Sequence, residues 1–324
     1  MREVVRLEHE SDDAARLMML QWALGNTCNF ACSYCPTDLH DGSVRSLPLP
    51  SILRFLERFI AAYAAPRRRI LIEFTGGEAT MYPHYPELIK CLSSHGVLLA
   101  LSSNGGRTLR YWESVARYLD HVNLTFHAEF TELSHLLAVI ALLQSHSVRV
   151  HVNVMMLPSQ FARCLAASEQ LVTETREVSV ALQALRYGIG NQMYPYTAKQ
   201  REVLATTLPV RRTSEANQLT KGRMVQVFSD GTREVIEPHL LVTTGKNRWR
   251  GWQCRVGLDE LVVDTRGQIW AGWCQVGGRI GHVTDEAIAF PSTPVRCDRS
   301  SCDCTLDVMN FRERTDPRPG NPRI

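Results

Sequence analysis

Residues 17–36 read LMMLQWALGNTCNFACSYCP, an apolar run followed directly by three closely spaced cysteines. The first seven of these residues, Leu17–Ala23, have the length and composition of a buried β-strand. The cysteines come at spacings of four and three residues, so one loop after the strand can present all three thiols to a single metal site. Three thiolates leave one iron of a four-iron cluster without a protein ligand. The stretch therefore predicts a metal site at the carboxyl end of the first strand of an α/β fold.

The composition of the 324-residue chain is that of a globular protein, with 44% hydrophobic and 21% charged residues and a net charge of +3. Such a small charge argues against an obligate nucleic-acid or membrane-surface partner. No apolar run is long enough to span a bilayer, and Met1–Arg16 has no apolar signal core, so we expect a cytoplasmic protein. In a reducing cytosol, ten cysteines indicate metal or catalytic sites rather than disulfides. Cys91 and Cys164 are exceptions, because they fall in helix-like segments as buried apolar side chains.

Strand-like and helix-like segments alternate between residues 17 and 205, after a short N-terminal extension at 1–16. The further predicted strands are Ile70–Phe74, Val97–Ser102, Val122–Phe126, Val148–Leu157 and Val178–Leu185. The predicted helices are Ser51–Tyr63, Tyr85–Ser94, Leu109–Leu119, Glu132–Gln144 and Phe161–Thr173. Six strands joined by helices favour parallel βαβ units, in an open sheet or a partial barrel. In either fold, ligands gather at the carboxyl ends of the strands.

The character of the sequence changes after about residue 188. Gly188, Gly190, Asn191 and Pro195 form a breaker cluster, and a polar stretch covers Arg211–Thr220. Two hairpins are predicted beyond it, Met224–Phe228 with Arg233–Ile236 and Glu260–Val263 with Gln268–Trp270. We therefore expect a cysteine-rich, β-containing α+β module at 206–310 and a disordered tail at 311–324, rich in Pro and Arg.

The first cysteine group carries a resemblance to a known family. Cys28, Cys32 and Cys35, with the aromatic Tyr34 before the last cysteine, resemble the CxxxCxxC signature of the radical S-adenosylmethionine (SAM) superfamily. In that family the cysteines hold a 4Fe-4S cluster whose open iron binds SAM. The resemblance covers nearly the whole chain and implies a partial (βα)6 TIM-like barrel, with backbone contacts from Tyr34 to adenine. The alternative for this loop is structural zinc, with His40 as fourth ligand.

Two further motifs follow the second and third predicted strands. Gly76, Gly77 and Glu78 resemble the family's GGE motif, which holds the amino group of SAM, and glycines suit a backbone that approaches a ligand closely. Ser103 and Asn104 resemble the third signature, which faces the ribose and carboxylate of SAM. Each motif alone would be read as a turn. Their order, each at the end of a strand, supports the resemblance.

Four other residues at strand ends are candidates for the same site. Asn153 on the fifth strand and Gln183 on the sixth are in position to reach SAM, or to be satisfied core amides. His127 and Glu129 end the fourth strand, where a substrate should approach. A histidine there serves either as a structural hydrogen-bonding residue or as a proton shuttle.

A second cysteine group lies in the C-terminal module and consists of Cys254, Cys274, Cys297, Cys302 and Cys304. It resembles the twitch (half-SPASM) module of some radical SAM enzymes, which carries one auxiliary 4Fe-4S cluster. Gly267 precedes Cys274 by seven residues, where the family usually has five, so the ligand set is four of these five cysteines without a fixed choice. Zinc is again the alternative. The fifth cysteine is either inert or a hydrogen-atom donor, with Cys297, Cys302 and Cys304 as the candidates.

The resemblance implies that a 5′-deoxyadenosyl radical removes a hydrogen atom from the substrate. Return of hydrogen from a cysteine would give an epimer, as in enzymes similar to the epimerase of neomycin biosynthesis. Loss of an electron to the auxiliary cluster would give an oxidised product, as in enzymes resembling inosamine dehydrogenase. Attack on a neighbouring group would give a crosslink or rearrangement. The surplus cysteine favours the epimerase.

The expected substrate is a small carbohydrate or aminoglycoside, because residues 1–16 are too few to form a leader-peptide recognition domain. Peptide epimerisation or crosslinking is the alternative. A flavodoxin- or ferredoxin-type protein is the expected electron donor. The segment Asn247–Arg255 alternates aromatic and basic residues, which suits nucleic acid or, more often, a packed wall around a cluster. A zinc-stabilised binding protein without catalysis is the non-enzyme alternative.

Overall fold

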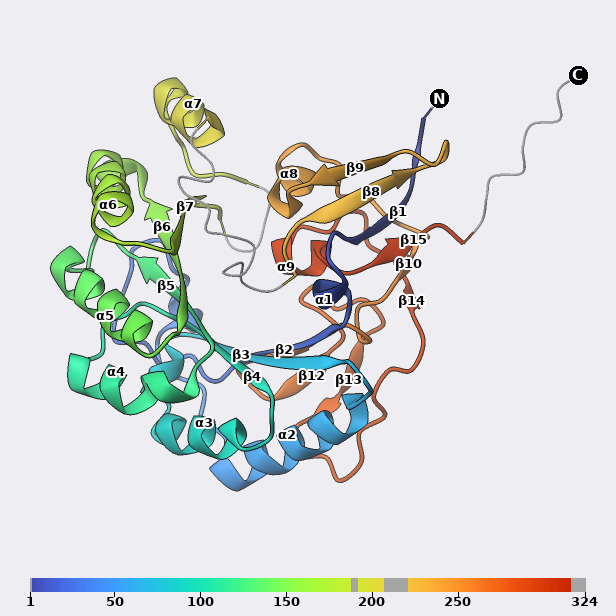
Figure 1. Cartoon of the computed structure of the whole chain (residues 1–324), viewed down its shortest axis with the longest axis horizontal. Coiled ribbons are helices and arrows are strands. Elements are labelled where there is room, and N and C mark those ends of the chain that lie inside the picture. The colour runs from blue at the N-terminus through green and yellow to red at the C-terminus, as the bar shows by residue number, and fades with distance from the viewer. Residues whose placement is uncertain (1, 188–191, 207–220, 316–324) are drawn as a thin grey trace, which may run out of the picture.

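The computed structural model describes residues 2–187, 192–206 and 221–315 (Figure 1). The predicted breaker residues at 188–191, the polar stretch at 211–220 and the tail from residue 316 onward lie outside these ranges. Residues 312 and 313, which the sequence places in the tail, form the short strand β15 (Arg312–Glu313).

All six strands predicted in the first part of the chain are present, within two residues at either end. They are β2 (Leu17–Ala23), β3 (Arg69–Thr75), β4 (Leu98–Ser103), β5 (His121–Phe126), β6 (Arg149–Met156) and β7 (Val178–Ala184). Each pairs in parallel with the next, so the strand order follows the chain order. The predicted α/β fold with a partial barrel is confirmed (Figure 1).

The same sheet continues into the C-terminal part of the chain. Strand β11 (Glu260–Val263) pairs in parallel with β2. β12 (Gln268–Trp270) pairs antiparallel with β11, and β13 (Arg279–His282) pairs antiparallel with β12. The order of the nine strands is β13-β12-β11-β2-β3-β4-β5-β6-β7. The predicted hairpin β11–β12 is confirmed, and its pairing with β2 adds a seventh parallel strand that local sequence patterns did not predict.

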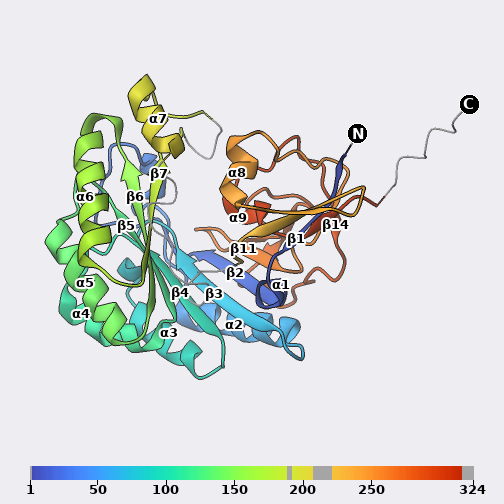
Figure 2. The same ribbon diagram turned by 45° about the horizontal axis from the view of Figure 1, so that its top comes forward.

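The helices between the parallel strands cover the convex face of the sheet (Figures 1 and 2). They are α2 (Leu49–Tyr63), α3 (Tyr85–Ser93), α4 (Leu109–Val115), α5 (Leu133–Ser145) and α6 (Phe161–Glu174). Short 3-10 turns accompany them at η1 (Thr37–Leu39), η2 (Ala79–Met81), η3 (Ala116–Tyr118) and η4 (Pro158–Gln160). In α2, the apolar residues recur on one face, and Ile52, Phe55 and Phe59 are fully buried against the sheet. No helix within the described ranges is long and apolar enough to cross a membrane.

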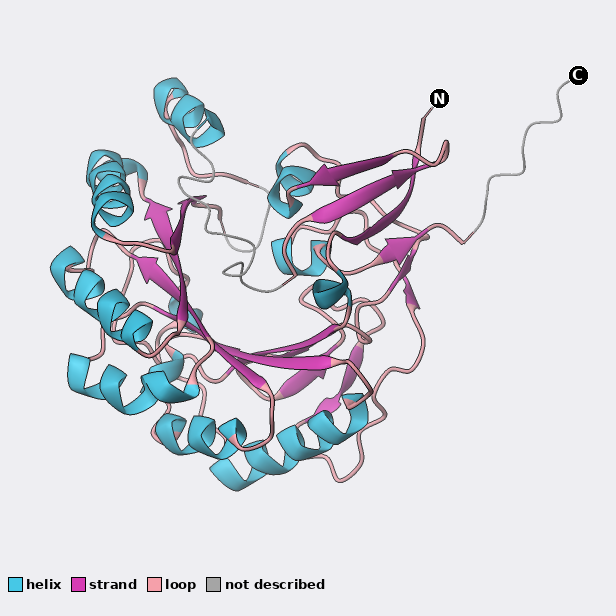
Figure 3. Cartoon of the chain, viewed as in Figure 1, coloured by secondary structure: helices cyan, strands magenta, loops and turns pink. Residues whose placement is uncertain are grey.

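A second sheet lies opposite the concave face of the first, in a region of short strands and long loops (Figure 3). Its order is β14-β10-β15-β1-β8-β9, with β1 (Val4–His9), β8 (Met224–Phe228), β9 (Arg233–Ile236), β10 (Gln253–Cys254) and β14 (Val295–Arg296). The remaining helices are α1 (Asp12–Ala15), α7 (Ala198–Thr206), α8 (Pro238–Thr243) and α9 (Thr305–Val308). The N-terminal strand thus belongs to this second sheet, and the predicted β8–β9 hairpin is confirmed.

The alternation of side chains along the strands gives the concave face its character. On β3, Ile70, Ile72 and Phe74 pack among the helices, so Leu71 and Glu73 point to the opposite face. Following the register outward from Glu73, the concave face also carries the polar residues Gln21, Ser102, Asn123, Thr125, His151, Asn153, Ser179 and Gln183. The interior of a barrel is usually packed with apolar side chains. The polar side chains on this concave face therefore indicate a ligand-binding surface.

Candidate active site at the carboxyl ends of the strands

Close contact between two backbones brings the glycine motif to the cysteine loop. The N–H of Gly77 donates to the carbonyl of Gly25 at 2.9 Å, and the N–H of Glu78 donates to that of Thr27 at 2.8 Å. A Cβ on Gly76 would lie 2.3 Å from the Gly25 oxygen, and one on Gly77 would lie 2.7 Å from that of Thr27. Gly76 also has a φ of +130°, which side chains rarely allow. The two glycines are therefore required by the protein's own packing.

Glu78 holds the loops after β3 and β4 together. Its buried carboxylate accepts hydrogen bonds from the Thr80 hydroxyl at 2.7 Å, the Ser103 hydroxyl at 3.0 Å and the Asn104 N–H at 2.8 Å. Complete burial raises the pKa of the Glu78 carboxyl above its ordinary value, and these donors oppose the rise. The carboxylate thus positions the second and third motifs relative to each other. Its contact with SAM stays a prediction.

Asn104 continues this network to the cysteine loop. Its side-chain amide donates to the Asn29 side chain at 2.8 Å and lies 3.7 Å from the sulfur of Cys28. Its side-chain oxygen accepts the N–H of Gly106 at 2.8 Å, which fixes the orientation of the amide. All three predicted motifs are therefore connected at one edge of the sheet, as the sequence predicted for strand ends.

The three cysteines of the first group lie on one loop, where the N–H of Cys35 donates to the carbonyl of Cys32 at 3.0 Å, and Cys28 and Cys35 both contribute to the raised pKa of the Cys32 thiol. Cys32 is buried, and burial raises the pKa of its thiol to about 11. It would therefore release a proton on becoming a metal ligand. Three thiols on one loop are a donor set that fits a four-iron cluster with one open position. Cys28, Cys32 and Cys35 would hold that cluster.

His127 and Glu129 lie against the cysteine loop. The Nδ1 atom of His127 is 2.5 Å from the hydroxyl of Tyr34 and 3.4 Å from the sulfur of Cys32. Glu129 accepts the N–H of Ser33 at 2.8 Å. Burial lowers the pKa of His127 to about 4, although Glu129 opposes the shift, so the imidazole is neutral at pH 7. The structure gives both residues a supporting contact with the loop, and their predicted contact with substrate is not tested by it.

Asn26 is a site residue that the sequence analysis missed. It is fully buried, and its amide donates to Asp38, Asp41 and Ser43 while its oxygen accepts the N–H of Val44 at 3.0 Å. These bonds close the long loop that contains the cysteines. The length of that loop was the available signal, because a long loop without regular structure needs an internal polar anchor.

Asn153 and Gln183 occupy the far side of the concave face. Asn153 lies on β6, and its side-chain oxygen is 3.1 Å from Nε2 of His151. Gln183 lies near the end of β7 and is exposed. Both face the concave side, as their predicted role requires, and their contact with SAM stays a prediction.

Glu73 forms a second polar centre, deeper on the concave face. Its buried carboxylate accepts hydrogen bonds from Gln21 at 2.6 Å, Ser102 at 2.8 Å and Asn123 at 2.8 Å. The Gln21 oxygen in turn accepts the indole N–H of Trp273 at 2.5 Å. Because Trp273 precedes Cys274, this contact connects the second cysteine group to the interior of the barrel.

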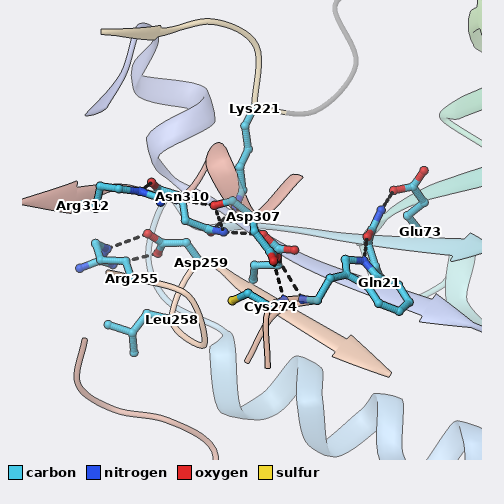
Figure 4. Close-up of polar contacts among 12 residues, drawn as sticks. Gln21, Glu73, Lys221, Arg255, Leu258, Asp259, Cys274, Asp307, Asn310 and Arg312 are labelled. Atoms are coloured by element: carbon cyan, nitrogen blue, oxygen red, sulfur yellow. Dashed lines mark hydrogen bonds and ion pairs between the residues drawn. The ribbon is translucent and has the colours of Figure 1, made fainter. Parts of the chain in front are cut away.

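The second cysteine group gathers around a few buried residues. Cys254, Cys274 and Cys302 interact electrostatically with one another, and Cys297 interacts with Cys254. Cys304 stands at the start of α9 and interacts with Asp307. The Asp307 carboxylate accepts the N–H of Cys274 at 2.6 Å, which fixes the loop after β12 (Figure 4). Four of the five cysteines thus interact with one another, Cys304 interacts with the neighbouring Asp307, and the predicted auxiliary cluster stays a prediction.

Other predicted features of this region can be placed as well. Trp249 and Trp252, from the segment alternating aromatic and basic residues, are buried in the core of the second sheet. Both tryptophan side chains are therefore packing residues, and neither ring is exposed for stacking on a nucleic-acid base. Among the described residues, no group of three His, Cys, Asp or Glu side chains forms a site for a single metal ion. His40, the alternative zinc ligand, has a buried Nδ1 without a hydrogen-bond partner in the described part of the chain.

Comparison with known proteins gives a family match for part of the chain. Residues 22–161 match the radical SAM superfamily. The 7-carboxy-7-deazaguanine synthase of Neisseria meningitidis serogroup B is 37% identical over 78 residues, which are 24% of this chain and 32% of that protein. The chain therefore matches about a third of the length of this curated relative.

Two solved structures share the fold over most of the chain. Native anSMEcpe with bound AdoMet and the Kp18Cys peptide has a TM-score of 0.50 at 16% identity, covering 83% of this chain and 78% of that one. SuiB of Streptococcus suis bound to the precursor peptide SuiA has a TM-score of 0.51 at 13% identity, covering 79% of this chain and 59% of that one. At these identities the likeness concerns the fold alone.

Proposed function

We propose that this chain, whose residues 22–161 match the radical SAM superfamily, is an enzyme that removes a hydrogen atom from a small, amine-bearing carbohydrate. The observation that carries the proposal is the Glu78 network, which joins the GGE loop and the Asn104 loop beside the three cysteines. A cluster on Cys28, Cys32 and Cys35, with SAM on its open iron and one electron from a flavodoxin- or ferredoxin-type donor, would supply a 5′-deoxyadenosyl radical.

The residues around that position would bind and orient SAM. Gly76 is exposed and Gly77 is half-buried beside the cysteine loop, and Asn104 sets the orientation of the next loop. His127 would hold the loop through Tyr34 and Cys32 without carrying a charge of its own near pH 7. These are positioning contacts, because a radical must be generated within reach of one substrate carbon.

We propose that the C-terminal module binds an auxiliary four-iron cluster through Cys254, Cys274, Cys297 and Cys302. Support comes from the mutual interactions of the first three thiols and from the contact of Cys297 with Cys254. Cys304 interacts instead with Asp307 and Glu260. A four-iron cluster without an open iron takes four thiolates, so this assignment leaves Cys304 free.

The position of Cys304 supports a catalytic role for its thiol. It precedes α9 directly, and Leu306 of that helix packs against concave-face residues of β2, β3 and β4. α9 therefore lies on the concave side of the first sheet, against the amino-terminal halves of these strands. In the proposed epimerisation, the deoxyadenosyl radical takes a hydrogen atom from carbon, and the Cys304 S–H bond returns a hydrogen atom to the opposite face. The resulting thiyl radical regains one electron and one proton from the external reductant and solvent, and each turnover consumes one SAM.

Glu73 supports the choice of an amine-bearing substrate. Its carboxylate faces the concave side of the sheet and has three neutral hydrogen-bond donors, and no cationic side chain of the described residues forms an ion pair with it. A buried carboxylate is costly unless a positive charge accompanies it. The ammonium group of an aminoglycoside-like substrate would supply that charge. The proposed preference for an amine-bearing substrate depends on this residue.

A peptide substrate is the second candidate, because both structures that share the fold hold a peptide. A lysine side chain would offer Glu73 the same ammonium group. The two candidates differ in what surrounds the amine, so substrates of both classes belong in one test.

The test is anaerobic incubation in D2O with SAM, dithionite and either neamine or a lysine-containing peptide. We expect 5′-deoxyadenosine to form faster with neamine, and one solvent deuterium to enter each product molecule. An oxidised product without deuterium would show that the enzyme is a dehydrogenase and not an epimerase. A colourless, zinc-loaded protein that does not cleave SAM would overturn the enzyme assignment.

Replacement of single cysteines tests the proposed donor. Cys304→Ala should retain the iron of both clusters, about eight atoms per chain, and still cleave SAM, but it should incorporate no deuterium into an epimer. Cys297→Ala should lose auxiliary-cluster iron. Cys91→Ala, on the outer helix α3, is the matched control and should change neither. Loss of iron in Cys304→Ala would show that Cys304 is a ligand and would end its role as donor.

A further inference from the structure

Arg312 is a buried cation beside the second cysteine group. It lies on β15 directly opposite Cys254 on β10, in an antiparallel pair. Its side chain is only 2% exposed. The facing position of Cys254 places its thiol beside the guanidinium, which interacts electrostatically with both Cys254 and Cys302. Figure 4 shows it at the edge of the polar network that includes Asp307 and Asn310.

The other direct contacts of Arg312 are with neutral groups. Its Nε donates to the carbonyl of Asn310 at 3.2 Å, a terminal nitrogen donates to the carbonyl of Asp307, and the guanidinium lies 4.0 Å from the centre of the Trp249 ring. Within the described part of the chain, no carboxylate forms an ion pair with it. The Asp307 carboxylate interacts with it only at longer range, because it binds the backbone N–H groups of Trp273 and Cys274.

A second arginine of the same module shows the usual arrangement. Arg255 makes two hydrogen bonds, of 2.7 and 2.9 Å, with the carboxylate of Asp259 (Figure 4). The side chain of Arg255 is 39% exposed, so it needs this partner less than Arg312 does. A fully buried guanidinium without an ion pair is costly, because removal of a charge from water must be offset by an opposite charge nearby. The cysteines beside Arg312 are therefore the candidates for its negatively charged partner.

Thiols are neutral, but cysteines that ligate iron do so as thiolates, and a four-iron cluster with four thiolate ligands is an anion. We propose that Arg312 is the fixed counter-charge of an auxiliary cluster bound by Cys254 and Cys302, and that it raises the reduction potential of that cluster. This inference rests on the proposed auxiliary cluster. A positive charge favours the reduced state, which is the more negative one, so the direction of the effect is defined.

The position of Arg312 in the sheet adds a structural consequence. β15 pairs with β10 on one side and with the N-terminal strand β1 on the other, where Leu7 lies opposite Arg312. Neutralisation of the buried charge by cluster binding would therefore stabilise the centre of the second sheet. The Arg312 side chain should therefore stabilise the protein when the cluster is bound and destabilise it when the cluster is absent.

The experiment uses the full-length chain with Cys28, Cys32 and Cys35 replaced by Ala, so that only the auxiliary cluster is loaded. Midpoint potentials are measured by redox titration followed by EPR spectroscopy, with Arg312 intact, in Arg312→Met and in Arg312→Lys. We expect a more negative potential in Arg312→Met and an intermediate one in Arg312→Lys, which keeps the charge but loses the planar donor geometry. Arg255→Met is the control and should leave the potential unchanged.

Thermal unfolding of the same proteins, with and without cluster, supplies the second readout. Arg312→Met should stabilise the cluster-free protein, because it removes an uncompensated buried charge, and should destabilise the loaded protein. An unchanged potential, or an equal loss of stability in both states, would assign Arg312 a packing role and overturn the proposal. If the parent protein with intact Arg312 binds no iron, the auxiliary cluster and this inference both fail. SAM cleavage by the otherwise unmodified chain would still test the proposed radical chemistry separately.

Discussion

The backbone N–H of Asn104 donates to the carboxylate of Glu78 at 2.8 Å, and this bond joins the loops that follow β3 and β4. The side chain of Asn104 reaches Asn29 and Cys28 from the same position. A carboxylate and an amide thus connect three loops that are far apart in the sequence. The geometry of the candidate SAM site depends on this connection before any ligand is bound.

Glu78→Gln should weaken both the fold and the binding of SAM. A glutamine presents one acceptor oxygen and an NH2 group that would face the donors of Ser103 or Asn104. One buried donor would lose its partner, at a cost of about 1–3 kcal/mol in the free energy of unfolding. Urea unfolding measures this cost, and equilibrium dialysis with labelled SAM measures the affinity. Glu87→Gln, in the first turn of α3 and exposed, is the control and should change neither quantity. Equal behaviour of the two variants would show that the Glu78 network does not position the site.

Alanine substitution at two glycines with positive φ distinguishes the stability cost of backbone strain from the cost of close packing. Gly76 has a φ of +130° and would place a Cβ 2.3 Å from the Gly25 carbonyl oxygen, whereas Gly96 has a φ of +67° with nothing within 4 Å. Gly96→Ala should cost about 1–2 kcal/mol from strain alone. Gly76→Ala should cost about 3 kcal/mol or more, because overlap adds to the strain. Urea unfolding of both variants gives the comparison, and a similar loss in both would contradict the close approach of the two loops.

The fold was largely predictable because its signals are local. The buried strand Leu17–Ala23 and the apolar face of α2 each lie within one short segment, where periodicity is sufficient. The parallel pairing of β11 with β2 was not predictable, since it joins residues more than two hundred positions apart. The residues Glu260–Val263 alone do not show whether this strand pairs only within its hairpin or also pairs with a strand of the barrel.

In the candidate site, too, some features could be predicted from the sequence and others could not. The three motifs are contiguous and could be read directly, and their convergence followed from the common direction of parallel strands. The roles of His127 and Glu129 could not be read in this way. Their distance from the cysteine loop is set by how that loop folds back, which depends on Asn26 and its partners. Position at a strand end therefore predicts proximity to the site but not the particular contact.

Stability should fall in mild acid because of buried neutral histidines. Burial and the neighbouring Arg149 and Arg69 lower the pKa of His121 to about 3, and burial lowers that of His9 to about 4. Below pH 6.5 the unfolded chain binds protons that these folded histidines do not, so the free energy of unfolding decreases as the pH falls towards 4. Each such histidine contributes about 1.4 kcal/mol per pH unit across this window. Urea unfolding of His121→Gln between pH 7 and 4 should show a shallower slope.

His84→Gln is the control for this experiment, since that side chain is 56% exposed. It should keep the wild-type slope. The cluster-free protein is used for all three, so that acid loss of iron does not contribute. A His121→Gln slope equal to that of wild type would show that His121 titrates normally in the folded state and would contradict its burial.

Glu73→Gln tests whether the buried carboxylate recognises an amine. The glutamine keeps the shape of the side chain and removes the charge, while Gln21, Ser102 and Asn123 remain in place. SAM cleavage without substrate should continue at the wild-type rate, because Glu73 lies deeper than the motif loops. The neamine-stimulated rate should fall at least tenfold, which corresponds to about 1.4 kcal/mol of lost interaction. The paired substrate is per-N-acetylated neamine, which has no ammonium group, and it should be a poor substrate for both proteins. If Glu73→Gln slows neither reaction, or slows the acetylated substrate as much as neamine, the carboxylate belongs to a structural network and the amine-bearing substrate class is excluded.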